Sequence, residues 1–498
     1  MGVLPSLAFS NILYRHSVPV ASPGCRVARP IAGRGARAKG ETNRVGRAPS
    51  GMTSTRSPGL ASIAAGLLLG SLPLAGPAGA TGFEVREQSA IGQGAAQAGV
   101  AARDDDPSML FFNPASMASL PGVQSAVVGS GIFPHAAMTE GMASRNALVG
   151  GSRVTGSLGG DIGVDAFLPA VYNTVQLATD WHLGLGVTSP WGLISKSPED
   201  GIARYHALTS TLRTVNITPA LSWQATPSLA LGAGLQVQYA TARLSSAMDF
   251  GAIGAAQRIP GFVPGARDGR STLSGDDTAL GWQVGAQWQP LPGTRLGLAF
   301  RSAVFHTLGG DALFEGVPSA LAPAFAKTGG KAKLTTPETA TLGLRQRLDD
   351  RWTLLGGLEW TNWSRFRDLT ISFANGRPPS VTEERWRDSV FVSLGGEYRW
   401  SEALTLRAGF AYDQTPVPEA TRTPRIPDND RYWLSVGASY EVWRNVTLSA
   451  AYTHIFAPGA TVNLQDPGPG NTNLFRTNLV GTYQVSVDIV TAQLRFAF

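Results

Sequence analysis

Residues that carry common types of chemistry are scarce in this sequence of 498 residues. The only cysteine is Cys25, so the rest of the chain offers no disulfide, no thiolate nucleophile and no cysteine-based metal site. The sequence pattern places no nucleophile beside a base. The later histidines also lack metal-ligand spacing. We therefore expect no metal, no cofactor and no enzymatic function. These histidines are His135, His182, His206, His306 and His454.

Long apolar runs are also scarce, because only one occurs, over roughly 60–75, and it is short for a spanning helix. It follows Arg56 and is followed by the small residues Ala78-Gly79-Ala80. A basic start, an apolar middle and a small-residue end are typical of a secretory signal peptide. We predict this signal over 52–80, with Met52 as its start.

The excess of positive charge is confined to the predicted leader. Residues 1–80 hold nine basic residues and one acidic residue, so the +6 of the whole chain becomes −2 from Thr81 onward. The basic isoelectric point therefore gives no reason to expect nucleic acid binding. Residues 1–51 are rich in Arg, Gly and Pro, and we interpret them as a mis-called start or a disordered extension.

Alternation with a period of two dominates the chain after residue 120. In 404–413, for example, Leu404, Leu406 and Phe410 share one face while Thr405 and Arg407 share the other. Many such runs have about ten residues, which is the length that a tilted strand needs to cross a bilayer. The pattern predicts fourteen strands, at about 122–134, 164–178, 181–195, 207–225, 229–248, 277–289, 294–316, 331–348, 351–375, 385–400, 403–415, 429–443, 445–463 and 480–498.

Connections between these strands alternate between tight turns and long polar loops, as in outer-membrane barrels. An even number of strands allows antiparallel closure, which leaves no unpaired edge in hydrocarbon. Six tryptophans lie beside the tight turns, and indole rings favour the membrane interface. We therefore predict an all-β fold over 122–498, a fourteen-stranded antiparallel transmembrane barrel in the bacterial outer membrane. The tryptophans are Trp181, Trp223, Trp288, Trp352, Trp400 and Trp443.

The last strand alternates up to a terminal aromatic residue, Phe498. Terminal strands of outer-membrane barrels usually look like this to the barrel assembly machinery, which we expect as a partner. Between Val487 and Val490 the apolar residues change sides. This change predicts a β-bulge or the point where the strand leaves the membrane.

Residues 81–121 do not alternate and are rich in Gly and Ala. A lumen of fourteen strands is wide enough to need filling, so we interpret this segment as an internal plug, or hatch. Asn113-Pro114 is then a turn within the plug, and Phe111 and Phe112 anchor the plug against the wall. The preceding acidic cluster, 104–106, is expected to form a turn or cap a helix rather than bind Ca²⁺.

The mature chain resembles the FadL-type outer-membrane transporters of long-chain fatty acids and other hydrophobic compounds. The resemblance rests on Gly82-Phe83, on Asp104-Asp105 leading into Asn113-Pro114-Ala115, and on the stretches "RTVNITPALSW" and "YDQTPVPEATRTPRIPDNDRYWLSVGASY". It implies that the N-terminal segment blocks the lumen and that Asn113, Pro114 and Ala115 belong to its gate. It also implies capture of ligand by the third and fourth outer loops and sideways exit through a break in the third strand.

The residues agree with these implications but leave alternatives open. Pro190-Trp191-Gly192 interrupts the third strand, because proline cannot donate a ladder hydrogen bond and glycine weakens pairing. This break is either a lateral opening or a kink where the strand leaves the membrane. Apolar residues on the long loops form either a capture patch or a core within the loops. They are Phe250, Ile253, Ile259, Phe262, Phe314, Val317, Leu321 and Phe325.

Charged residues predicted to face the lumen have both signs. They either hold the hatch by ion pairing, or one arginine among them binds the carboxylate of a fatty acid. Our carboxylate candidates are Arg301, Arg345 and Arg407, with Arg243 where the fifth strand exits. Lys333 belongs to a lysine cluster that either steers a carboxylate or contacts lipopolysaccharide phosphates.

The sequence therefore predicts a monomeric barrel for passive, hatch-gated diffusion of hydrophobic molecules, most simply long-chain fatty acids, into outer-membrane lipid. Sideways exit suits an apolar solute, which has no reason to enter water when lipid is adjacent. Three alternatives remain open. They are uptake of aromatic hydrocarbons by the same fold, a general water-filled porin, and a structural or adhesive surface barrel.

Overall fold

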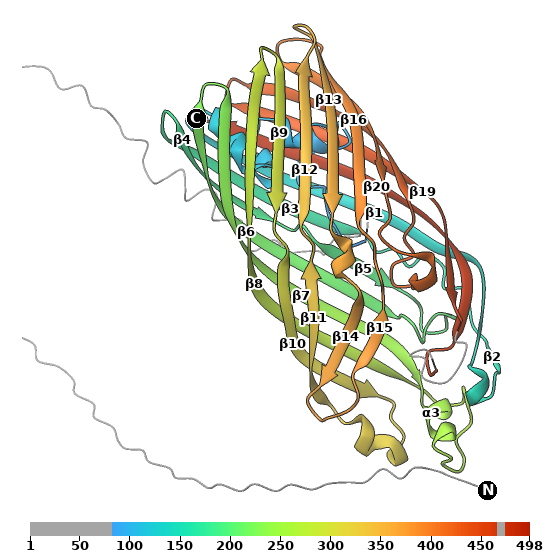
Figure 1. Ribbon diagram of the computed structural model, residues 1–498. Helices are drawn as coiled ribbons and strands as arrows, with labels where there is room; N and C mark the ends of the chain where they lie inside the picture. Colours follow the sequence, from blue (N-terminus) through green and yellow to red (C-terminus); the bar gives the residue numbers. More distant parts are fainter. Residues whose placement is uncertain (1–81, 466–473) are drawn as a thin grey trace, which may run out of the picture. The chain divides into compact units, whose positions relative to one another are not determined.

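A closed antiparallel barrel is the main feature of the computed structural model, which describes residues 82–465 and 474–498 (Figure 1). β1 (Val123–Ser144) pairs on one side with β3 (Ala166–Ala178) and on the other with β20 (Asn478–Ala497), so the first and last strands close the sheet. The predicted fourteen-stranded antiparallel barrel is confirmed. The predicted extension and signal peptide, 1–51 and 52–80, lie outside the described residues.

Nine of the fourteen strands of the barrel wall are continuous, and each of the other five is interrupted and carries two labels. The fourteen wall strands therefore have nineteen labels. The short β2 (Arg153–Val154) pairs only with the end of β1. Besides β1, β3 and β20, the continuous strands are β6 (Thr209–Thr226), β7 (Leu229–Asp249), β8 (Asp268–Leu291), β17 (Leu404–Asp413), β18 (Arg431–Trp443) and β19 (Val446–Leu464). The interrupted walls are β4 (Trp181–Thr188) with β5 (Gly192–Lys196), β9 (Thr294–Arg301) with β10 (Val304–Glu315), β11 (Thr328–Thr336) with β12 (Thr339–Arg347), β13 (Trp352–Thr361) with β14 (Asp368–Phe373), and β15 (Ser380–Glu383) with β16 (Ser389–Arg399).

Side chains alternate between the lipid face and the lumen along each wall. In β4 the exposed positions include Trp181, Leu183 and Leu185, while His182 and Gly184 between them are buried. Large apolar residues face outward because the solvent there is hydrocarbon. All six tryptophans beside the tight turns are outward, with 41–66% of their surface exposed, which places an aromatic girdle at that rim.

The predicted β-bulge in the last strand is wrong, and the alternative, that the strand leaves the membrane there, stays a prediction. β20 keeps one unbroken register with both neighbours from Val487 to Val490. Val487 and Ile489 instead point inward and are buried against other apolar lumen residues, among them Ile132 and Ile455. The apolar pattern changes sides because this part of the lumen is itself apolar.

Short helices occupy the N-terminal segment and the loops. Among the residues that the structure describes, no helix has the length and apolar character to cross a membrane. The helices of the N-terminal segment are α2 (Ala90–Gln93), η1 (Val100–Ala102), η2 (Pro107–Phe111) and η3 (Pro114–Ser119). The others are η4 (Ala147–Val149), α3 (Phe250–Ala256), η5 (Ser319–Phe325), η6 (Trp363–Arg365) and η7 (Glu419–Thr421).

Candidate functional site

The N-terminal segment, residues 82–121, packs against the inward faces of the wall strands, and we call it the hatch segment. The backbone of the hatch segment packs directly against glycines of the wall strands. A methyl group at Gly297 would lie 1.9 Å from the carbonyl oxygen of Ala101, and one at Gly409 would lie 2.2 Å from that of Ala95. Real Cβ atoms do not come this close, so only glycine admits the hatch at these positions. Small residues on both sides allow this close packing.

The predicted gate turn is fastened to both the hatch and the wall. Asn113 is fully buried and caps η3, since its Oδ1 accepts a hydrogen bond from the Ala115 amide at 2.9 Å. Its Nδ2 donates to the carbonyl oxygens of Ala101 at 2.7 Å and of Ala286 in β8 at 3.1 Å. Changing Asn113 would therefore remove one donor from each of these carbonyls, although Ala101 keeps the Gln287 amide at 3.0 Å.

The two predicted anchor phenylalanines lie beside this turn. Phe111 packs in a buried cluster with the wall residue Tyr172. Its ring meets that of Phe112 edge to face, with centroids 4.9 Å apart. Arg301 of β9 lies 4.0 Å above the Phe111 ring and donates to the Phe111 carbonyl oxygen at 2.5 Å. Arg301 is thus engaged with the hatch in this structure.

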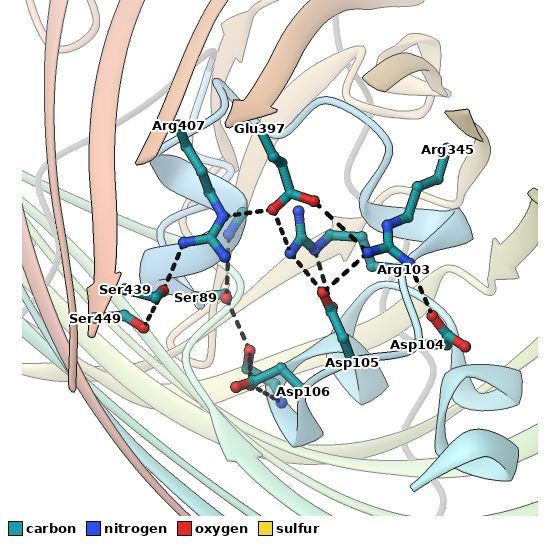
Figure 2. A network of polar contacts seen from close by, with 12 residues as sticks. Ser89, Arg103, Asp104, Asp105, Asp106, Arg345, Glu397, Arg407, Ser439 and Ser449 are labelled. Carbon is teal, nitrogen blue, oxygen red and sulfur yellow. Dashed lines mark hydrogen bonds and ion pairs between the residues drawn. The ribbon is translucent and has the colours of Figure 1, made fainter. Parts of the chain in front are cut away.

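A network of ion pairs joins the hatch to the wall (Figure 2). Arg103 of the hatch contacts Asp105 and the wall residue Glu397, each at 2.9 Å. Arg407 of β17 binds the same Glu397 at 2.7 Å. Arg345 of β12 lies 3.6 Å from Asp105 and 3.7 Å from Glu397. Arg345 and Arg407 therefore have carboxylate partners, as the hatch-holding interpretation expects.

The residues of the acidic cluster, 104–106, have different partners. Asp106 caps η2 by accepting from the Ser108 amide at 2.9 Å, as predicted. Asp104 instead forms ion pairs with Arg295 and, at 3.4 Å, with Arg345. The sequence did not reveal these pairs, because they join residues far apart in the chain.

The predicted break in the third wall is present and carries a partner from the hatch. β4 ends at Thr188 and β5 begins at Gly192. β3 pairs with β4 only as far as Val171. Beyond the break, the two sides meet again at an isolated bridge between Gly163, which precedes β3, and Ser195 of β5. Across the break the hatch residue Glu84 bridges Trp191.

Two backbone hydrogen bonds fix the hatch at this break. The Val85 amide donates to the Pro190 carbonyl oxygen at 2.8 Å, and the Gly192 amide donates to the Phe83 carbonyl oxygen at 2.7 Å. The start of the hatch therefore serves as a short strand that occupies the interruption. Two features that the sequence presented separately, the N-terminal Gly82-Phe83 and the strand break, are one structure.

The Phe83 side chain fills an aromatic pocket formed by Trp191, Trp363, Phe366 and Trp386. Its ring centroid lies 4.6 Å from that of Trp363, 5.6 Å from Trp386, 5.7 Å from Phe366 and 6.1 Å from Trp191. All five residues are buried. All four pocket residues lie in interruptions of wall strands, where no alternation points them inward. The sequence analysis identified Trp191 as part of the break and missed Trp363, Phe366 and Trp386. Aliphatic residues extend the pocket: Leu212, Leu308, Leu334 and Val417.

A family model described as "Outer membrane protein transport protein (OMPP1/FadL/TodX)" matches residues 71–498 of the chain. The chain belongs to this family. It is similar to the long-chain fatty acid transport protein of Salmonella typhi, with 26% identity over 80% of this chain and 93% of that protein. It is therefore an integral outer-membrane barrel that transports hydrophobic compounds, and not an enzyme.

Solved structures agree with this membership. A Pseudomonas aeruginosa FadL homologue superposes with a TM-score of 0.77 at 25% identity, covering 84% of this chain and 100% of that one. The Ralstonia pickettii toluene transporter TbuX superposes with a TM-score of 0.59 at 17% identity, covering 82% and 99% of the two chains. The second likeness shows a shared fold.

The apolar residues of the two long loops of this FadL-family chain pack against each other. Phe250, Ile253, Leu321 and Phe325 are buried in one cluster formed by α3 and η5. Burial lowers the pKa of the neighbouring Arg377 guanidinium, which lies 4.4 Å above the Phe325 ring. This arrangement matches a core within the loops, and only part of the predicted capture surface is accessible. The partly buried members are Ile259, Phe262, Phe314 and Val317.

Two of the predicted carboxylate candidates point away from the lumen. Arg243 is exposed on the outward face of β7, the same face as the exposed Tyr239. Lys333 is exposed on β11. These positions do not support a role for either residue in reading a carboxylate inside the barrel. Lys333 remains placed for a contact with lipopolysaccharide, which stays a prediction.

Proposed function

We propose that this protein carries long-chain fatty acids across the outer membrane by passive diffusion, gated by the hatch segment, with exit through the break in the third wall. The proposal rests on one observation, the double role of one hatch residue. The Phe83 side chain fills the aromatic pocket, while its backbone pairs with the broken strand. A ligand that takes the place of the ring also pulls on the peptide that occupies the break.

In the proposed sequence of events, the ligand moves from one apolar surface of the protein to the next. A fatty acid first meets the partly buried apolar residues of α3 and η5 at the outer loops. It then competes with Phe83 for the aromatic pocket. Once the Phe83 backbone leaves Gly192, the gap between β3 and β5 opens toward lipid. An alkyl chain enters lipid more readily than water, because leaving water is favourable for apolar surface.

Competition with Phe83 gives a measurable test. Burying a phenylalanine side chain contributes roughly 1.5–3 kcal/mol, so the ring disfavours a competing ligand by roughly 10- to 100-fold. Phe83→Ala should therefore tighten the binding of labelled palmitic acid to the purified barrel by about that factor. Phe112→Ala is the matched control, since it removes the same side chain from the same segment outside the pocket.

The outcomes separate the candidates. Tighter binding in Phe83→Ala alone supports the proposal, and equal behaviour of the two variants contradicts it. Uptake of toluene-sized compounds in place of palmitic acid would keep the hatch mechanism and move the substrate to aromatic hydrocarbons. Steady ionic conductance with no bound hydrophobic ligand would indicate a general porin. No uptake of any of these would favour a structural or adhesive barrel.

A further inference from the structure

A polar cavity occupies the end of the lumen where the tight turns lie, and these turns face the periplasm in outer-membrane barrels. The cavity has a volume of about 320 Å³, which is many times the space that one water molecule needs, and it is partly open to solvent. Gly293 is the one lining residue without a polar side chain. Because the walls offer no apolar surface to an alkyl chain, this cavity suits a small hydrophilic ligand and not a fatty acid.

Arginine side chains dominate the lining of this cavity, which we call the mouth site. Six arginines and four acids line it, so positive charge is in excess by two. Five of the arginines lie in β9, β12, β16 and β17, and the sixth lies in the turn before β13. These five strands are neighbours in the wall, which brings the charges together. The arginines are Arg295, Arg345, Arg347, Arg351, Arg399 and Arg407, and the acids are Asp105, Asp349, Asp350 and Glu397.

Three of the six guanidinium groups have no acidic partner. In the part of the chain that the structure describes, no carboxylate oxygen lies within 4.0 Å of Arg347, Arg351 or Arg399. The turn residue Asp349 accepts hydrogen bonds from the backbone amides of Arg351 and Trp352, both at 2.7 Å, and so serves the turn. Because like charges in one cavity repel each other, the mouth site favours an added anion.

The other three guanidinium groups are engaged with the hatch or with Glu397. Arg295 and Arg345 both form ion pairs with Asp104 of the hatch, the second at 3.4 Å (Figure 2). Arg407 binds Glu397 at 2.7 Å. The Nε atom of Arg345 is nevertheless buried and, among the described residues, has no hydrogen-bond partner. The seated hatch therefore supplies counter-charge to the mouth site without satisfying it.

A small oxyanion with more than one charge matches this site. Guanidinium groups bind phosphate oxygens through paired, charge-assisted hydrogen bonds. One phosphate or pyrophosphate accepts from several guanidinium groups at once, because its oxygens point in different directions. Neutral polar side chains complete the lining, namely Gln289, Thr294, Thr353 and Thr405.

Such an anion competes with the hatch for Arg345. The hatch residues Asp104 and Asp105 lie 3.4 and 3.6 Å from this guanidinium. Displacing the hatch withdraws both carboxylates and leaves Arg345 to the anion. A ligand that binds the displaced state more tightly shifts the equilibrium toward that state.

We propose that the mouth site binds small multivalent oxyanions of the phosphate type, and that the bound anion loosens the hatch by replacing Asp104 and Asp105. The hatch acids thus serve as built-in competitors of a periplasmic anion. The binding step goes beyond the proposed function and does not depend on it, whereas the loosening step rests on its hatch gating.

Pyrophosphate is the probe for binding. Its affinity is measured by isothermal titration calorimetry on the purified full-length barrel in lipid nanodiscs, at an ionic strength held constant with sodium chloride so that screening does not change. The double variant Arg347→Gln with Arg399→Gln should bind pyrophosphate about 10- to 100-fold more weakly than wild type. Arg243→Gln removes an exposed, outward guanidinium and should bind like wild type. Arg351→Gln is a second measurement in the same direction if the double variant does not fold.

Amide hydrogen exchange in the hatch measures the loosening. Saturating pyrophosphate should speed exchange in residues 100–106 of wild type by roughly 10-fold, the equivalent of one charge-assisted contact. Sodium chloride of equal ionic strength should not produce this change. The double variant, at the pyrophosphate concentration that saturates wild type, should show a smaller increase than wild type.

Three results would overturn the inference. Wild type that binds no pyrophosphate has no such site, and equal affinity of wild type and the double variant would place binding elsewhere. Binding with unchanged hatch exchange would contradict the competition with Asp104 and Asp105. By contrast, a barrel that binds pyrophosphate at the mouth site but no palmitic acid would overturn the proposed function and leave the anion site intact.

Discussion

Glu397 is the wall residue whose loss should loosen the hatch most specifically. Its carboxylate is buried and accepts from Arg103 of the hatch and Arg407 of the wall at 2.9 and 2.7 Å. Glu397→Gln keeps the size of the side chain and removes the charge. Arg103 keeps Asp105, and Arg407 keeps the Ser439 hydroxyl, so neither guanidinium becomes fully unpaired.

The expected magnitude follows from which contact changes when the hatch moves. The contact between Glu397 and Arg407 lies within the wall and persists with the hatch displaced, whereas the contact with Arg103 is lost. A hydrogen bond to a charged group contributes about 1.5–3 kcal/mol. Losing it should shift the equilibrium between seated and displaced hatch by roughly 10- to 100-fold.

Single-channel recording in planar bilayers measures this shift directly. Openings of the Glu397→Gln barrel should be roughly 10- to 100-fold more frequent than those of wild type. Glu441→Gln is the control, because it removes the same charge from an exposed position at the end of β18. A folded Glu397→Gln barrel that opens no more often than Glu441→Gln would refute the reasoning.

Three further predictions concern the seating of the hatch and the closure of the barrel. Gly297→Ala places a methyl group 1.9 Å from the Ala101 carbonyl oxygen, so it should destabilise the seated hatch by about 1–3 kcal/mol and increase channel openings. Gly329→Ala is the control and should not increase openings, because the atom nearest to its added methyl group lies 3.5 Å away. Asn113→Ala leaves the buried carbonyls of Ala101 and Ala286 without that donor, which should weaken the gate turn by about 1–3 kcal/mol and speed amide hydrogen exchange in 95–103; unchanged exchange would contradict this. Phe498→Ala alters the terminal aromatic residue whose backbone pairs with Val123 at 2.8 and 3.1 Å, and it should lower the fraction of heat-modifiable, assembled barrel in outer membranes.

The wall was predictable because its solvent imposes a repeating rule. Lipid outside and a filled lumen inside require alternation, and alternation is visible residue by residue, as in β4. The rule fails where the lumen is apolar. At Val487 and Ile489 the inward residues are as apolar as the outward ones, so the sequence suggested a bulge that is absent.

The site was only partly predictable. Motif resemblance located Asn113-Pro114-Ala115 and the break at Pro190, since both have local signatures. The pairing of Phe83 with Gly192 and the aromatic pocket around it join residues more than 100 positions apart, with Trp363 among them. No local pattern encodes such contacts.

Locking the hatch to the broken wall tests the central claim most directly. Cys25 is the only cysteine of the sequence, so in a Cys25→Ser background a pair introduced as Glu84→Cys and Trp191→Cys forms the only disulfide available to the chain. These residues are partners in an antiparallel bridge, whose Cα separation of about 4.5–5.5 Å suits a disulfide. The same cells are assayed for uptake of labelled palmitic acid when oxidised and when reduced. The account predicts that uptake is lost on oxidation and returns on reduction. Equal uptake in both states, with the disulfide verified, would contradict hatch gating at the strand break.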